Sequence, residues 1–124
     1  MLPCYVVLDL ETTGGNASQD RITEIAAVRM EAGQEVARWS TLVQPGVPIP
    51  PFIQSLTGIT DAMVADAPDF AEVAPELIRI LDGAVLVAHN VRFDHGFVLN
   101  ELARLDMALK TKTLCTVRLS RKLY

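Results

Sequence analysis

The segment 5–10, with the sequence YVVLDL, constrains the fold more than any other part of this chain. All of its positions except Asp9 are apolar, so neither face of a strand built from it is suited to water. Such a strand belongs in the middle of a sheet whose faces are covered. The turn residues Gly14, Gly15 and Asn16 follow it closely. The sequence therefore predicts a buried central strand that ends close to Asp9.

The remaining elements follow from changes of period along the chain. Segments 21–30 and 35–44 read as strands of an antiparallel hairpin around Gly33, and the proline-rich stretch 45–51 reads as an extended connector. Helices are expected at 52–56, 68–81 and 93–105, a buried strand at 84–88, a short strand at 112–115 and a further helix from 116 to 124. This order predicts one α/β domain over residues 1–124, a mixed sheet flanked by helices.

The two longer helices are each expected to bury one stripe of apolar side chains. The inward residues of the first are Ala71, Ala74, Leu77, Ile78 and Leu81, and those of the second are Phe93, Phe97, Leu102 and Leu105.

Composition narrows the class of protein. Half of the 124 residues are hydrophobic and 21% are charged, as in an ordinary folded domain. No apolar run is long enough to span a bilayer, and the first residues lack a signal-peptide pattern. The cysteines Cys4 and Cys115 are expected to be reduced thiols of a cytoplasmic protein. A net charge of −4 argues against a protein that coats nucleic acid, but it suits an enzyme in which bound cations supply the positive charge.

A pair of acids stands at the end of the central strand. Asp9 and Glu11 are two positions apart, so their side chains project from the same face. Their mutual repulsion destabilises the fold unless a divalent cation offsets it, and Mg²⁺ and Mn²⁺ prefer such oxygen ligands. The alternative is that Asp9 starts an Asx-turn and that Glu11 is simply solvated.

A second polar cluster follows the strand expected at 84–88. His89 and Asn90 come directly after it, and Asp94 falls in the first turn of the next helix. In one interpretation, Asp94 is merely a partner of the helix dipole, and His89 and Asn90 merely form hydrogen bonds with local backbone groups. Two strand ends that carry acids can also converge on one site at the edge of the sheet, and this is the reading we favour.

The chain resembles the DEDD exonuclease superfamily of ribonuclease H-like fold, most of all the epsilon (proofreading) subunits of bacterial DNA polymerase III. Residues 7–14 (VLDLETTG) match the first exonuclease motif, and residues 87–94 (VAHNVRFD) match the second. Residues 56–61 (LTGITD) match a segment between the two motifs. Because three segments agree in order and spacing, the resemblance is specific.

The resemblance implies a metal-dependent 3′–5′ exonuclease that releases nucleoside 5′-monophosphates by a two-metal-ion mechanism with Mg²⁺ or Mn²⁺. Asp9 would bridge both ions, Glu11 would bind one, and Asp94 would bind the other. The substrate would be the 3′ end of single-stranded nucleic acid, preferably DNA. The implied substrate-binding residues are Thr12, Thr13, Gly14, Leu56, Ile59, His89, Asn90 and Phe93.

The third motif of the family, with its general-base histidine and fourth metal-binding aspartate, is not present in these 124 residues. We expect the chain to be the N-terminal part of a longer exonuclease that lacks its C-terminal helices, and to be inactive alone. The expected partners are a replicative polymerase or a fused repair domain. The alternatives are an exoribonuclease of the ribonuclease T or oligoribonuclease type, and a catalytically dead module that binds nucleic acid or a partner.

Overall fold

The computed structural model describes residues 4–16, 18–88, 91–105 and 112–118, with the backbone alone described for 91–93 and 112–118. Within these ranges the elements follow in the order β1 (Tyr5–Thr12), β2 (Ile22–Glu31), β3 (Gln34–Leu42), α1 (Pro51–Thr57), α2 (Asp61–Val64), α3 (Phe70–Leu81), β4 (Val85–Ala88), α4 (Val91–Arg104) and β5 (Lys112–Arg118). No helix in this part of the chain is both long and apolar enough to cross a bilayer.

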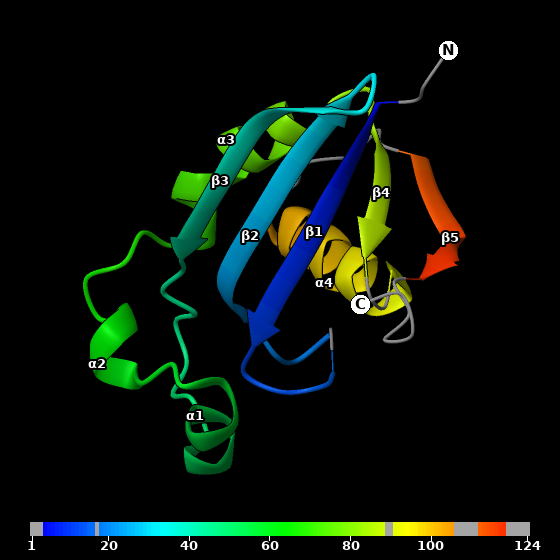
Figure 1. Cartoon of the computed structure of the whole chain (residues 1–124). Helices are drawn as coiled ribbons and strands as arrows, with labels where there is room; N and C mark the ends of the chain where they lie inside the picture. The colour runs from blue at the N-terminus through cyan, green and yellow to red at the C-terminus, as the bar shows by residue number, and fades with distance from the viewer. Residues whose placement is uncertain (1–3, 17, 89–90, 106–111, 119–124) are drawn as a thin grey trace.

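The strands form one mixed sheet in the order β3-β2-β1-β4-β5, with β1 at its centre (Figure 1). β1 pairs with β2 and β2 with β3 in antiparallel fashion, whereas β4 runs parallel to β1 and to β5. The predicted central strand and mixed sheet are confirmed. So is the hairpin, whose turn residues Ala32 and Gly33 have φ angles of 51° and 79°, as a tight turn between twisted strands requires.

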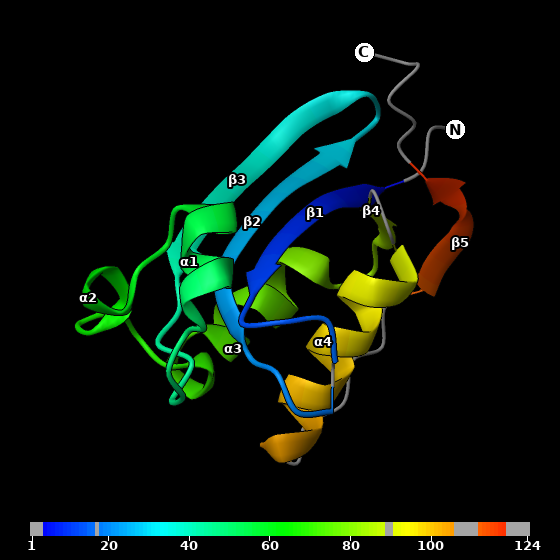
Figure 2. The ribbon, with the colours of Figure 1, turned by 90° about the horizontal axis from the view of Figure 1, so that it is seen from below.

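Helices α3 and α4 cover one face of the sheet (Figures 1 and 2). Val6, Leu8 and Leu10 of β1 point into this core and are almost fully buried. The alternate residues Tyr5, Val7, Asp9 and Glu11 lie on the opposite face and are only partly buried or exposed. In the described residues, therefore, one face of β1 is covered as predicted, while the other face is the one that carries the acids.

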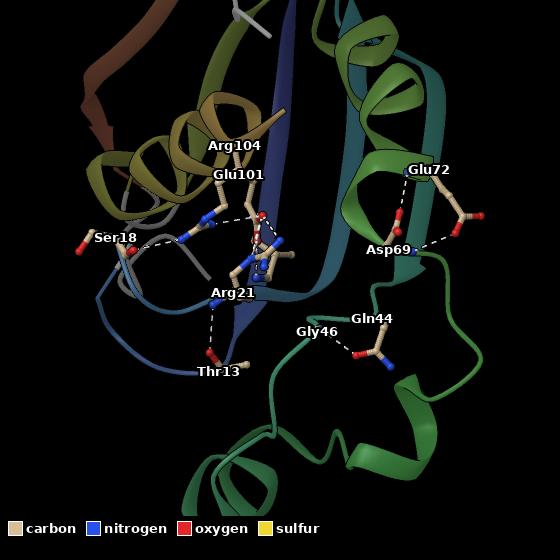
Figure 3. A network of polar contacts seen from close by, with 10 residues as sticks. Thr13, Ser18, Arg21, Gln44, Gly46, Asp69, Glu72, Glu101 and Arg104 are labelled. Carbon is tan, nitrogen blue, oxygen red and sulfur yellow. Dashed lines mark hydrogen bonds and ion pairs between the residues drawn. The ribbon is translucent and has the colours of Figure 1, made fainter. Parts of the chain in front are cut away.

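Helix α3 begins at Phe70, two residues later than the predicted helix. Asp69 is its N-cap, and a reciprocal pair of hydrogen bonds with Glu72 completes a capping box (Figure 3). The predicted inward stripe is wrong at Ala71, which is exposed. The larger side chains set the orientation of the helix, and its buried residues are Phe70, Val73, Ala74, Leu77, Ile80 and Leu81.

Two other expectations about secondary structure are wrong. Helix α2 was not expected, because four residues are too few to show a helical period. Strand β5 continues to Arg118, although a helix was expected from Thr116. The pairing Ala88↔Arg118 extends the strand beside β4, and tertiary pairing of this kind outweighs local propensity. The expected helix beyond Arg118 lies outside the described residues.

Candidate active site

The carboxyl end of β1 extends past its parallel neighbour. The pairing of β1 with β4 runs from Tyr5↔Val85 to Leu8↔Ala88, so β4 offers no partner to residues 9–12. Helix α4 begins close to the end of β4 and crosses behind β1 (Figure 1). This topology brings the first turn of α4, which carries Asp94, towards the stretch of β1 that carries Asp9 and Glu11.

The two acids of β1 share a face with a third acid from β2. Asp9 is exposed and Glu11 is partly buried, and the antiparallel register places Glu24 directly opposite Glu11. Burial raises the pKa of Glu11, and the charges of Asp9 and Glu24 raise it further. Like charges opposite each other in a sheet destabilise the pairing, so the fold keeps this cluster at a cost.

Asp94 is the most strongly perturbed of the predicted site residues. Its side chain is 6% exposed, and burial, together with the charges of Asp9 and Glu11, raises its pKa to about 7. These charges act on Asp94 only if the carboxylates lie within reach of each other's field. The structure thus brings the three predicted metal-binding residues, Asp9, Glu11 and Asp94, into one electrostatic cluster.

Within the described residues, no group of three or more His, Cys, Asp and Glu side chains is arranged as a formed metal site. The three acids are therefore near one another without making a ready cage around a single point. Their chemistry still fits a hard divalent cation, because all the donors are carboxylate oxygens. A cation would also offset the repulsion that raises the pKa values of Glu11 and Asp94.

The loop after β1 is held by hydrogen bonds to Asp20. The hydroxyl of Thr13 donates to Asp20 Oδ1 at 3.1 Å, and the amide of Asn16 donates to Asp20 Oδ2 at 2.9 Å. A Cβ atom on Gly14 would lie 2.5 Å from Asp20 Oδ2, so only glycine fits against this fixed carboxylate. The Thr13 amide donates to Arg21 O at 2.8 Å, and the Thr12 hydroxyl donates to Gly14 O at 2.7 Å.

A pocket of about 260 Å³ opens between this loop and helix α1. Glu11 and Thr12 contribute to one wall, and Leu56 contributes to the other. Leu56 is 69% exposed although it is a large apolar residue. The other lining residues are Leu10, Gly14, Gly15, Ile53 and Thr57. The structure therefore brings three predicted substrate-binding residues, Thr12, Gly14 and Leu56, to the same pocket as the predicted metal ligand Glu11. The fourth residue of this part of the chain, Thr13, is buried and does not line the pocket.

The other predicted substrate-binding residues lie elsewhere or are not described. Ile59 is 4% exposed and packs with Ile49 and Val64 in a small second core, so it supports α1 and α2 and does not line the pocket. His89 and Asn90 lie outside the described residues, and the same holds for the side chain of Phe93.

Several residues near the site were not singled out in the sequence. Glu24 could not be found there because its position opposite Glu11 depends on the register between β1 and β2. Ile53, one turn before Leu56, and Thr57, directly after it, also line the pocket, which only the orientation of α1 reveals. Arg21 and the buried Glu101 form a partly buried ion pair between distant segments (Figure 3), and no local pattern marks it.

A mixed sheet with helices on one face and a group of acids at the end of its central strand is the arrangement of α/β proteins with a ribonuclease H-like fold. Residues 6–124 match the family model RNase_T, described as exonuclease. The chain belongs to this exonuclease family.

Three curated relatives illustrate the range of proteins that contain a similar sequence. The chain is 43% identical over 120 residues to a DNA polymerase III PolC-type of Caldanaerobacter subterraneus subsp. tengcongensis, covering 97% of the chain and 9% of that protein. It is 45% identical over 122 residues to the 3′-5′ exonuclease DinG of Bacillus subtilis, covering 97% of the chain and 13% of that protein. It is 38% identical over 122 residues to the DNA polymerase III subunit epsilon of Aquifex aeolicus, covering 97% and 60%. The chain thus spans only part of each of these proteins.

Solved structures show the same fold. Exonuclease X, in complex with 5′ overhanging duplex DNA, is 33% identical with a TM-score of 0.72, and the match covers 97% of this chain and 64% of that one. Exonuclease I of E. coli, in complex with a dT13 oligonucleotide, has a TM-score of 0.79 at 19% identity, over 90% of this chain and 27% of that one. The second likeness concerns the fold alone.

Proposed function

We propose that the natural protein containing these residues is a metal-dependent 3′–5′ exonuclease that releases nucleoside 5′-monophosphates from DNA 3′ ends. The observation that carries this proposal is that, in a chain of the exonuclease family, the buried Asp94 of α4 lies within electrostatic reach of Asp9 and Glu11 at the end of β1. A fold that keeps three repelling acids together gains nothing in stability from them. Strongly perturbed groups of this kind concentrate at functional sites.

Asp9, Glu11 and Asp94 would hold two divalent ions, Mg²⁺ or Mn²⁺, through their carboxylate oxygens. When bound, such ions supply a water nucleophile at neutral pH and stabilise the leaving oxygen of an in-line displacement. The protein residues provide the negative charge and fix its position. Glu24, which lies opposite Glu11 in the neighbouring strand, would add to the negative field of the site.

The pocket beside Glu11 would receive the terminal nucleotide. Leu56 presents an exposed apolar surface to the pocket, which suits the face of a base, and every base has such a face. Since the Thr13 amide is already engaged by Arg21, we assign the wall made by Glu11 and Thr12 to the sugar and 3′ hydroxyl. Phe93, His89 and Asn90 remain proposed substrate contacts from the sequence alone.

DNA is the proposed substrate because of the relatives. Exonuclease X was solved with duplex DNA that has a 5′ overhang, and the relatives include two kinds of DNA polymerase III component. We accordingly propose a polymerase or a repair domain as partner. These 124 residues contain no counterpart of the third motif's histidine and aspartate, so we also propose that they cleave little or nothing alone.

The test is a digestion of single-stranded DNA and of RNA of the same sequence, each labelled near the 5′ end, by the natural protein with Mg²⁺ or Mn²⁺. We expect stepwise shortening of DNA from the 3′ end, and none with Asp9→Ala, whose fold is checked by circular dichroism. Faster shortening of RNA would favour the exoribonuclease alternative. No shortening of either substrate, with an unchanged melting temperature on adding metal, would favour the non-catalytic alternative.

A further inference from the structure

The buried carboxylate of Glu101 joins helix α4 to the start of β2, which is far from it in the sequence. It lies on α4, is 1% exposed, and accepts hydrogen bonds from the Arg21 guanidinium at 2.8 to 3.0 Å. It also accepts one from the Ile22 amide at 3.1 Å, and Arg104 Nη1 lies 3.3 Å from its Oε1. Figure 3 shows these contacts together. Ion pairs with two parallel hydrogen bonds fix orientation as well as distance.

The ion pair between Arg21 and Glu101 is connected on one side to the end of strand β1, which carries the first motif. The Arg21 amide donates to the Thr13 hydroxyl at 3.0 Å, and the Thr13 amide donates to Arg21 O at 2.8 Å. Thr13 directly follows β1, which carries Asp9 and Glu11. Arg104 also donates to Ser18 O at 3.1 Å, so the loop after β1 is held from two points.

On the other side, the ion pair between Arg21 and Glu101 is connected to Asp94 through helix α4. Glu101 follows Asp94 by two helical turns, and residues at that spacing lie on one side of a helix. Both are buried. The apolar residues of α4 in the core, Phe97, Val98 and Leu102, pack the helix against the sheet through contacts that have no preferred direction. The bidentate ion pair adds bonds of defined direction and length.

We propose that Arg21 and Glu101 are positioning residues that set the distance between Asp94 and the acids of β1, and thereby the affinity of the site for divalent metal. This inference rests on the proposed function, in which these acids bind metal. It explains why a full carboxylate is buried at a place where an apolar residue would pack α4 equally well. Among the described residues, the three acids are near one another but are not arranged as a formed metal site. Their spacing is therefore the quantity that the ion pair between Arg21 and Glu101 can control.

The test is a titration of the natural protein with Mn²⁺ while its melting temperature is measured, for the wild type, Glu101→Gln and Arg21→Lys. Glu101→Gln keeps the size of the side chain but loses the ion pair, and we expect it to need roughly tenfold more Mn²⁺ for half of the full rise, at the low end of the effects of residues that orient metal ligands. Arg21→Lys keeps the charge but not the two parallel bonds, so it should show a smaller shift and remains informative if Glu101→Gln does not fold.

The control is Val73→Ala on α3, a core residue away from the acids. It should lower the melting temperature of the metal-free protein and leave the half-saturating Mn²⁺ concentration unchanged. If Glu101→Gln and Arg21→Lys also leave the half-saturating Mn²⁺ concentration unchanged, Arg21 and Glu101 are merely structural and the inference is overturned. A wild-type protein with no rise at any Mn²⁺ concentration would instead contradict the proposed function from which the inference starts.

Discussion

At the scale of single residues, Asp94 differs from the two acids of β1 in its surroundings: it is buried and its pKa is raised to about 7, whereas Asp9 is exposed and Glu11 is partly buried. The spacing of Asp9 and Glu11 was enough to place both on one face of a strand. The burial of Asp94 could not be read from the sequence, because it depends on α4 crossing behind β1 (Figure 1). Ile59 was expected at the substrate and lies in a small core, since an isolated apolar residue in a sequence carries no sign of which surface it faces.

The raised pKa of Asp94 predicts how stability depends on pH in the absence of metal. Between about pH 4 and pH 7 the folded protein holds a proton on Asp94 that the unfolded chain has released, so raising the pH through this window lowers the free energy of unfolding. The loss is on the order of 4 kcal/mol and is complete above pH 7. Asp94→Asn should remove it and make the metal-free protein more stable than the wild type at pH 8.

Melting temperatures in EDTA from pH 5 to 8.5 measure this effect. Asp66→Asn, a change at an exposed position, serves as the control and should follow the wild-type curve. Parallel curves for the wild type and Asp94→Asn would show that Asp94 has an ordinary pKa in the folded protein.

Leu56 supplies a second prediction at this scale. Leu56→Ser should raise the KM for single-stranded DNA roughly fivefold, because packing part of a leucine against a base is worth about 1 kcal/mol. The value of kcat should change little, since the acids are untouched. Met63→Ser, which alters an exposed apolar residue on α2 outside the pocket, should leave both constants as they are. Equal effects of the two variants would remove Leu56 from the proposed site.

At the scale of elements, local rules predicted most helices and strands, and failed where a distant partner decides. The hairpin of β2 and β3 and the central strand β1 follow from alternation and turn residues. Helix α2 is too short to have a period, and β5 extends to Arg118 because it pairs with β4. The inward face of α3 was shifted at Ala71 because small and large apolar residues were weighted alike, whereas burial favours the larger ones.

The cap of α3 gives a prediction that concerns stability alone. Asp69→Ala removes the side-chain acceptor for the Glu72 amide, which lies 3.0 Å away, and should lower the free energy of unfolding by about 1 kcal/mol. Urea unfolding measures it, with Asp66→Ala as the control at an exposed acid that caps no helix. The rise in melting temperature on adding Mn²⁺ should be the same in both variants. A loss of that rise in Asp69→Ala would mean that α3 takes part in the site.

At the scale of the whole molecule, the sequence predicted the class of fold but not the contacts between segments that are far apart in the chain. The order of elements and the three motifs pointed to a ribonuclease H-like exonuclease, and the family match over residues 6–124 confirms this. The pocket between α1 and the loop after β1, and the ion pair between Arg21 and Glu101, join segments that only the folded chain brings together. Contacts of this kind leave no local pattern in a sequence.

The central claim is that Asp9, Glu11 and Asp94 form a site for divalent metal. Its most direct test is a crystal of the natural protein grown with Mn²⁺ and a nucleoside 5′-monophosphate, measured at the manganese absorption edge. We predict anomalous difference peaks between the carboxylates of Asp9, Glu11 and Asp94, and none there in crystals of Asp9→Asn. Manganese bound only at other positions, or no peak near these three residues at saturating Mn²⁺, would contradict the claim.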